Sequence, residues 1–283
     1  MIITKADGST EEFRQGKLIS SLKRAGAKPA EITKIVERIE ATLKEGMRTQ
    51  EIYQKAFQYL RESNDPVAAK YSLRRAVFGL GPTGFPFEDF LGKIFEAEGY
   101  KTKRRLTIRG KCAVHEIDLA AYSPDHSFVA EAKFHMRPGT KSDLQVAMYS
   151  YARYLDLKSE RVCAGDTCGI ISLYLITNTK FTLAAIKYAE CSGINLLSWD
   201  YPKHDSLRIK IERYKLYPIT VLSRLSSGQK VVLLQRGVIL CSELLKKQNY
   251  LLDLGLSRAK IEGIVHEIHA LYGSTRPSLT KKS

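Results

Sequence analysis

One stretch of the sequence, residues 114–134, limits the possible folds more than any other because it places charges inside a predicted hairpin. Val114–Tyr122 is β-prone and rich in apolar residues, Ser123-Pro124-Asp125 has the composition of a turn, and Phe128–Phe134 alternates again. Side chains two positions apart on a strand project from the same face. We therefore predict two antiparallel strands, with Asp118 on the first and with Glu131 and Lys133 on one face of the second.

The three charged residues of this hairpin indicate chemistry. Charges within apolar strands cost several kcal/mol unless they are paired or bind a metal. Two carboxylates at one place are oxygen ligands that suit Mg²⁺ or Mn²⁺, which makes Asp118 and Glu131 candidate metal ligands. Lys133 is a candidate to orient or deprotonate an attacking water, or to stabilise charge that develops on a phosphate.

The order of these residues, Asp118 and then Glu131-Ala132-Lys133, resembles the PD-(D/E)xK nuclease superfamily, and the surrounding segments resemble its Mrr-like restriction endonuclease branch. Residues 87–100 resemble the first helix of that family, and residues 175–178 and 196–200 resemble its later strands. Ile117 stands where the family usually has proline, which leaves the metal ligand intact. The resemblance implies a Mg²⁺-dependent DNA endonuclease whose metal is held by Asp118 and Glu131. It also implies that Lys133 assists the nucleophilic water and that Gln145 and Glu88 support the catalytic site.

Four residues near this triplet have alternative explanations. Glu88 lies near the start of a predicted helix, where a favourable helix-dipole interaction explains it almost as well as catalysis. Gln145 is predicted near the start of another helix, where it could face the metal site; an exposed glutamine is the alternative. His115 is predicted on the strand face opposite to Asp118, whereas His135 shares the face of Lys133, where DNA contact or support of the site is expected.

The net charge of +15 predicts a polyanionic partner, because neutralising phosphates and releasing their counterions drives non-specific DNA binding. A solvated basic surface without a ligand is the alternative. The sequence has no apolar run of about 18 residues, and its first residues lack the layout of a signal peptide. We therefore predict a cytoplasmic protein that does not enter a membrane.

The first 78 residues have the pattern of a separate domain. Asp7-Gly8 lies between two β-prone segments and predicts a hairpin. Apolar periodicity then predicts four helices, the third of which begins with Thr49 as its N-cap. This order, together with residues 5–11 and 46–53, resembles the ATP-cone, a nucleotide-sensing domain best known from ribonucleotide reductases.

The ATP-cone resemblance implies ATP or dATP as an effector and a nucleotide-dependent homo-oligomer. It implies that Lys5 and Lys17 meet the triphosphate, that Glu11 and Arg14 meet the nucleoside, and that Thr49 meets the phosphates or sugar. The sequence of this segment lacks a glycine-rich phosphate loop, which favours binding of the nucleotide over its hydrolysis. A helical interaction module with surface lysines is the alternative.

The predicted fold class is α/β. Three glycines and two prolines in residues 79–86 predict a linker. The complete domain prediction is a mainly helical ATP-cone at 1–78, this linker at 79–86, a restriction-endonuclease-like mixed sheet flanked by helices at 87–218, a helical segment at 219–273 and a basic tail at 274–283. Residues 251–264, with Gly255 and Ser257, resemble a helix-hairpin-helix, which binds DNA phosphates through backbone amides; packing or dimerisation explains them equally well.

Two other functions remain open at this point. A nucleotide-sensing DNA-binding regulator has the same two modules without cleavage, and ATP-cone repressors are its precedent. A junction or repair nuclease has the same catalytic residues as a restriction enzyme and differs only in its DNA substrate.

Overall fold

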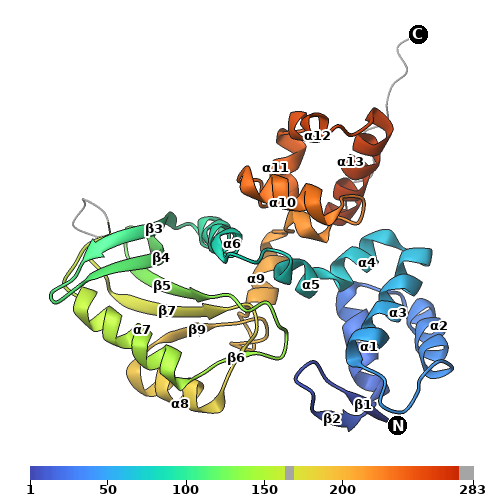
Figure 1. The fold of residues 1–283 in the computed structure, drawn as a ribbon, viewed down its shortest axis with the longest axis horizontal. Helices are drawn as coiled ribbons and strands as arrows, with labels where there is room; N and C mark the ends of the chain where they lie inside the picture. Colours follow the sequence, from blue (N-terminus) through green and yellow to red (C-terminus); the bar gives the residue numbers. More distant parts are fainter. Residues whose placement is uncertain (163–168, 274–283) are drawn as a thin grey trace. The chain divides into compact units, whose positions relative to one another are not determined.

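The computed structural model describes residues 1–162 and 169–273 (Figure 1). The chain divides into two compact units, one formed by Met1–Ala76 with Tyr217–Ser283 and the other by Val77–Leu216. The predicted basic tail at 274–283 lies outside the described residues. In the described part of the chain, no helix is both long and apolar enough to cross a membrane.

The first unit begins with the predicted hairpin, in which β1 (Ile2–Thr4) pairs antiparallel with β2 (Thr10–Glu12). Helices follow in the predicted order: α1 (Gln15–Ala25), α2 (Pro29–Glu40), α3 (Thr49–Ser63), α4 (Asp65–Tyr71) and α5 (Leu73–Phe78). Their apolar faces form one core that includes Leu22, Ile39, Ala56 and Leu60. The apolar periodicity of the sequence is therefore the pattern that buries this core.

Two local predictions in this unit were wrong. The N-cap of α3 is Arg48, and Thr49 is the first helical residue. The predicted fourth helix is divided at Ser72 into α4 and α5. The Ser72 hydroxyl donates to the Ala69 carbonyl, and side-chain bonds of this kind compete with the regular helical pattern.

The same unit contains the C-terminal helices, which confirm a helical C-terminal region. They are preceded by the short 3₁₀ helix η2 (Ile219–Val221) and comprise α10 (Ser227–Gln235), α11 (Cys241–Lys246), α12 (Asn249–Asp253) and α13 (Arg258–Tyr272). Gly255 has φ +69° in the turn between α12 and α13, a conformation that favours glycine. The Ser257 hydroxyl accepts the Lys260 amide and caps α13 as predicted.

The second unit contains a mixed sheet with strand order β3-β4-β5-β7-β9. The first three strands, β3 (Lys101–Arg109), β4 (Val114–Tyr122) and β5 (Ser127–Lys133), pair antiparallel. The others, β7 (Ser172–Thr177) and β9 (Asn195–Leu197), continue the sheet in parallel with β5. A small parallel pair, β6 (Lys141–Ser142) and β8 (Lys180–Phe181), lies apart from this sheet. The predicted hairpin at 114–134 is thus the centre of the sheet (Figure 1).

Helices cover both faces of this sheet. Helix α6 (Phe85–Ala97) packs on one face, where Phe95 contacts Phe128 and Phe87 contacts Phe134. Helices α7 (Leu144–Leu157) and α8 (Leu183–Ser192) cover the other face, where Val129 shares a core with their alanines. Helix α9 (Leu207–Tyr214) completes the unit. The chain is thus an α/β protein with a mixed sheet between helices, as predicted.

The predicted linker at 79–86 has more structure than its composition suggested. Helix α6 begins at Phe85, with Gly84 as its N-cap. Leu80 is fully buried, and a side chain at Gly81 would meet the Phe134 ring at 2.6 Å. This segment is therefore packed against the second unit near the end of β5.

Candidate functional site

Asp118 lies where the pairing between β4 and β5 ends. The last paired residues are Leu119 and Ala130, and beyond them the Ala132 amide donates to Asp118 Oδ2 at 2.7 Å. The carboxylate therefore takes the place of a backbone acceptor and is fixed beside the strand that carries Glu131. Burial raises the pKa of Asp118, against the lowering effect of the Ala132 amide.

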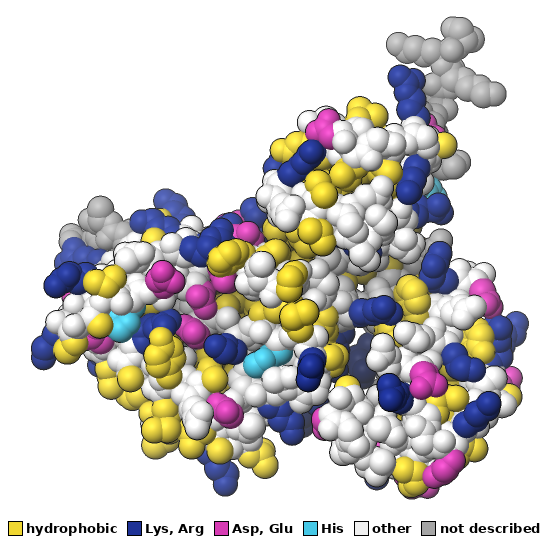
Figure 2. Space-filling view, in the orientation of Figure 1, with side chains coloured by type: hydrophobic (Ala, Val, Ile, Leu, Met, Phe, Trp, Pro, Cys, Tyr) yellow, Lys and Arg dark blue, Asp and Glu magenta, His cyan; other side chains and the backbone are white. Residues whose placement is uncertain are grey.

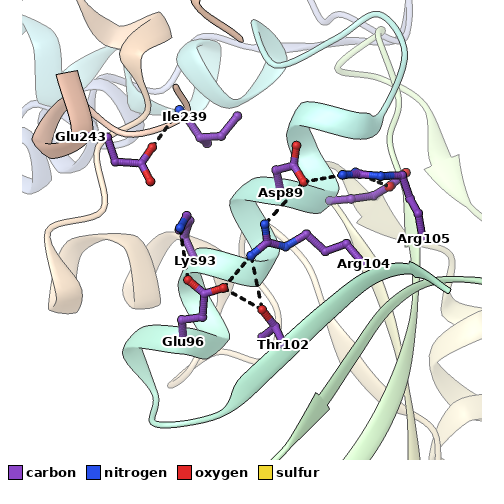
Figure 3. A network of polar contacts seen from close by, with 9 residues as sticks. Asp89, Lys93, Glu96, Thr102, Arg104, Arg105, Ile239 and Glu243 are labelled. Atoms are coloured by element: carbon purple, nitrogen blue, oxygen red, sulfur yellow. Dashed lines mark hydrogen bonds and ion pairs between the residues drawn. The ribbon is translucent and has the colours of Figure 1, made fainter. Parts of the chain in front are cut away.

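The neighbouring strand is also irregular at this level. Arg105 and Asp118 are the residues missing from an otherwise continuous register between β3 and β4. Arg105 has φ +53°, a left-handed conformation that costs about 1 kcal/mol for a residue with a side chain. Its guanidinium reaches Asp89 on α6 at 3.0 Å (Figure 3). It also reaches Glu88 on the same helix, at 3.3 Å. Strained backbone and clustered charge thus coincide beside Asp118.

Glu131 points to the face of the sheet that α7 covers. Its Oε2 accepts from Arg153 Nη1 at 2.5 Å, and both side chains are mostly buried, with 13% and 15% exposure. Burial raises the pKa of Glu131, the Asp118 charge raises it further, and Arg153 and Lys133 lower it. The two carboxylates therefore repel each other, and nearby positive side chains offset this repulsion.

Lys133 lies two positions beyond Glu131 on β5 and is exposed. The strand end that carries Lys133 is held by buried polar residues. The Thr177 hydroxyl donates to the Lys133 carbonyl at 2.7 Å, and the Asn178 amide makes two bonds of 2.8 Å with the backbone of His135. Both side chains have no exposed surface, so the end of β5 is rigidly positioned.

Glu88 is the third acid of this region and extends from the first turn of α6. It is 8% exposed, and its pKa is raised to about 7, first by burial and then by the charge of Asp118, while Arg105 opposes the shift. A carboxyl with such a pKa exchanges protons near neutrality. The charge of Asp118 therefore acts on Glu88.

The remaining predicted residues are less directly connected. Gln145 is exposed on α7, on the stripe that Tyr149 and Arg153 continue at four-residue intervals. His115 is turned away from Asp118 and contacts Asp156 at 2.7 Å. His135 contacts the Ser142 hydroxyl at 3.0 Å, and burial lowers its pKa. Of the two histidines, His135 is the one held close to Lys133.

The donor set fits a magnesium ion with few protein ligands. Across residues 1–162 and 169–273, no group of three or more His, Cys, Asp or Glu side chains is arranged to hold a metal. Magnesium commonly uses one or two carboxylates, with water and substrate phosphate as its other ligands. Asp118 and Glu131 each use one carboxylate oxygen in the bonds described above, which leaves Oδ1 and Oε1 as the corresponding donors.

Basic side chains are distributed over the surface. On the face drawn in Figure 2, Lys and Arg lie among acidic and apolar side chains on each part of the chain. In β3, Lys101, Lys103, Arg105 and Arg109 are exposed at alternate positions. Arg105 is paired with Glu88 and Asp89, and the Lys103 ammonium donates to the Val162 carbonyl. Lys101 and Arg109 are therefore the cations of this edge strand that suit contact with a phosphate backbone.

A second candidate site is a cavity of about 170 Å³ in the first unit. It is lined by four of the five residues predicted for the nucleotide, Glu11, Arg14, Lys17 and Thr49. The fifth, Lys5, contacts Glu11 at 3.5 Å, and Lys17 contacts the same carboxylate at 2.7 Å. The bond from Lys17 lowers the pKa of Glu11.

Stacked aromatic rings form another wall of this cavity. Tyr53 and Tyr71 stack with centroids 5.0 Å apart and planes 8° from parallel. Burial raises the pKa of Tyr53 above its usual range and that of Tyr71 to about 12. The buried Tyr53 hydroxyl has no hydrogen-bond partner among the described residues. The cavity thus combines cations with an apolar wall, which suits a nucleotide.

Family models match both ends of the first unit. The ATP cone domain matches residues 1–77, and the AF1548-like C-terminal domain matches residues 217–272. The chain therefore contains an N-terminal ATP cone, a domain class that supports binding of a nucleotide effector, joined to an α/β unit with a mixed sheet.

A relative in Archaeoglobus fulgidus, an uncharacterized protein, is 32% identical over 184 residues, which are 65% of this chain and all of the relative. The crystal structure of the protein of unknown function AF1548 is 31% identical, has a TM-score of 0.56, and covers 67% of this chain and 99% of its own. The chain belongs to the AF1548-like family.

Two further solved structures are more distant. A repair endonuclease from Pyrococcus abyssi is 18% identical, with a TM-score of 0.30, over 41% of this chain and 46% of its own. Can2 from Sulfobacillus thermosulfidooxidans, in complex with cyclic tetra-adenylate, is 13% identical, with a TM-score of 0.30, over 71% of this chain and 52% of its own. Likenesses of this size do not bear on the function of this chain.

Proposed function

We propose that this protein is a Mg²⁺-dependent DNA endonuclease of the PD-(D/E)xK type, similar to Mrr-like enzymes, and that ATP or dATP bound to the ATP cone regulates it. The observation that carries the proposal is the position of Asp118. Its carboxylate is hydrogen-bonded to the strand of Glu131 and Lys133, in a region where burial raises the pKa of both acids. Carboxylates kept in such a place are stabilised by a cation.

Each residue then has a defined task. Asp118 and Glu131 would hold the ion, which would supply Lewis-acid polarisation of the phosphate when bound. Lys133 projects from the rigid end of β5 and orients the attacking water. The water oxygen forms a bond to phosphorus while the bond to the leaving oxygen breaks, and that oxygen takes a proton from solvent. Glu88 and Gln145 support the site, with Glu88 able to accept a proton near neutral pH.

The cavity of the ATP cone is the proposed regulatory site. Lys5 and Lys17 would meet the triphosphate, Glu11 and Arg14 would meet the nucleoside, and Thr49 would meet the phosphates or sugar. Nucleotide-dependent homo-oligomerisation would then bring two nuclease sites to two DNA strands. A cleavage rate and a sedimentation coefficient that are both unchanged by saturating ATP and dATP would exclude this regulation.

The test of the nuclease is cleavage of supercoiled plasmid with Mg²⁺ or Mn²⁺, with and without ATP. We expect Asp118→Asn and Lys133→Ala each to slow cleavage by at least about a hundredfold. Asp125→Asn is the matched control, because Asp125 is an exposed acid in the turn between β4 and β5. Tight binding of plasmid, branched and methylated DNA without cleavage would instead support the DNA-binding regulator.

A further inference from the structure

Arg153 is the positive side chain most closely bound to the proposed metal site, and no sequence motif drew attention to it. It lies on α7, 22 residues after Glu131, and its Nη1 donates to Glu131 Oε2 at 2.5 Å. The pair is mostly buried, so solvent screens it weakly. Arg153 therefore occupies one oxygen of a carboxylate that the proposed function assigns to a divalent ion.

The guanidinium is also held by groups other than Glu131. Nη1 donates to the Glu116 carbonyl at 3.0 Å, and Nη2 donates to the Tyr149 hydroxyl. Its central carbon lies 4.7 Å from the centroid of the Tyr149 ring. These contacts do not depend on the Glu131 carboxylate, so the guanidinium keeps its place at the site if that carboxylate turns to another cation.

The buried Nε of Arg153 has no hydrogen-bond partner among the residues that the structure describes. That nitrogen is enclosed, so an incoming anion would reach the guanidinium through Nη1 once Glu131 has released it, and arginine pairs well with phosphate oxygens. Lys133, two positions beyond Glu131 on the same strand, is exposed and adds a second positive charge that acts on this carboxylate. Arg153 thus contacts a carboxylate through a donor that a second anion could use.

We propose that Arg153 is an exchangeable counter-ion, which neutralises Glu131 before a divalent cation binds, releases that carboxylate to the cation, and then binds an oxygen of the DNA phosphate. This inference rests on the proposed nuclease function. Arg153 would then be a positioning residue that weakens metal binding, because it competes for Glu131, and that afterwards helps to bind the substrate. Its effects on metal affinity and on cleavage therefore have opposite signs.

The experiment compares Arg153→Gln, Arg153→Lys and Arg104→Gln with the wild-type full chain. Arg104→Gln is the matched control because Arg104 pairs with Glu96 at the same distance of 2.5 Å, and neither is assigned to the metal (Figure 3). Mn²⁺ affinity is measured by titration calorimetry without DNA. Plasmid cleavage is then measured at saturating Mn²⁺, with the fold of each variant checked by circular dichroism.

We expect Arg153→Gln to bind Mn²⁺ at least about fivefold more tightly than wild type, because the competing charge is gone. We also expect it to cleave about a hundredfold more slowly at saturating metal. Arg153→Lys should keep the wild-type Mn²⁺ affinity within about twofold, and so should the control. A merely structural arginine would not produce tighter metal binding together with slower cleavage.

Unchanged or weaker Mn²⁺ binding by folded Arg153→Gln, beside a wild type that binds Mn²⁺ and cleaves, would overturn the role of Arg153 alone. Tighter Mn²⁺ binding with an unchanged cleavage rate would overturn its contact with the phosphate. Failure of the wild type to bind Mn²⁺ and to cleave any DNA would overturn the proposed function itself.

Discussion

The sheet site and the cavity of the ATP cone use the same kinds of side chain with opposite electrostatic results. At the sheet, burial raises the pKa of Asp118, Glu131 and Glu88. In the cone, the bond from Lys17 lowers the pKa of Glu11, which is half-buried. A cation stabilises the ionised form of an acid whose pKa is raised by burial. A pocket lined with lysines instead stabilises a bound anion. The difference predicts a metal at one site and a phosphate-bearing ligand at the other.

The largest effect on stability should come from removing the Asn178 side chain, which supports the end of β5 at the sheet site. Asn178→Ala removes two buried bonds to the His135 backbone and leaves both backbone groups without partners, which should lower the free energy of unfolding by about 2–3 kcal/mol. Asn195→Ala is the control, since exposed Asn195 makes one bond of 3.4 Å. Urea unfolding measures both; equal losses would mean that the end of β5 is not specially held.

The raised pKa of Glu88 should appear as a pH-dependent stability. Because its pKa in the folded protein is about 7 and its ordinary value is 4.5, Glu88 contributes stability that is complete below pH 4.5 and is lost as the pH rises through 7. Glu88→Gln should therefore gain on the order of 2 kcal/mol relative to wild type between pH 4.5 and 8.

Glu96 on the same helix is the control for that experiment. Its pKa is lowered overall, since its bonds outweigh the burial that raises it. Its stabilising contribution is therefore present above the unfolded pKa and is lost as the pH falls through the folded one. Glu96→Gln should lose stability relative to wild type as the pH rises. If the stabilities of both variants, relative to wild type, changed with pH in the same direction, the opposite pKa shifts of Glu88 and Glu96 would be contradicted.

Nucleotide binding by the cone should weaken when a positive side chain of its cavity is removed. Lys17→Ala should weaken ATP binding about tenfold, because it removes from the cavity a positive charge that we propose to contact the phosphates. Lys23→Ala, an exposed lysine in the last turn of the same helix, provides the comparison. Calorimetric titration with ATP and dATP measures both, and equal affinities for the two variants would remove Lys17 from the site.

The smallest effect should come from the aromatic wall of the cavity. Tyr53→Phe removes a buried hydroxyl that lacks a partner among the described residues, while the ring that stacks on Tyr71 remains. We expect the free energy of unfolding without nucleotide to rise by up to about 1 kcal/mol. Thermal unfolding should show the rise in the absence of ATP. A clear loss of stability would indicate that the hydroxyl is bonded in solution.

The fold was predictable wherever a local period determines burial. The β-prone segments and the turn before Glu131 and Lys133 gave the right hairpin. The apolar stripes of the cone helices gave the right helices, because one face of each helix is buried. The break at Ser72 depends on a single side-chain bond, which periodicity does not reveal. The packing of Leu80 depends on tertiary contacts, so composition alone indicated a linker.

The site was only partly predictable for the same reason. Asp118, Glu131 and Lys133 lie on paired strands, where spacing determines the face of each side chain. Arg153 reaches Glu131 from a helix, and Arg105 reaches α6 through a left-handed backbone conformation. Neither contact can be predicted from the periodicity of the sequence. The four-residue interval from Gln145 through Tyr149 to Arg153 was the available signal, since these positions share one helical face.

The bond from the Ala132 amide to Asp118 has a further consequence. Most amides of a sheet are protected from exchange with solvent by a neighbouring backbone carbonyl, but this one is protected by a side chain. Its hydrogen should exchange slowly only while the Asp118 carboxylate is ionised and in place. One backbone amide therefore reports the condition of the whole site, and its exchange rate can be followed by NMR without metal, nucleotide or DNA.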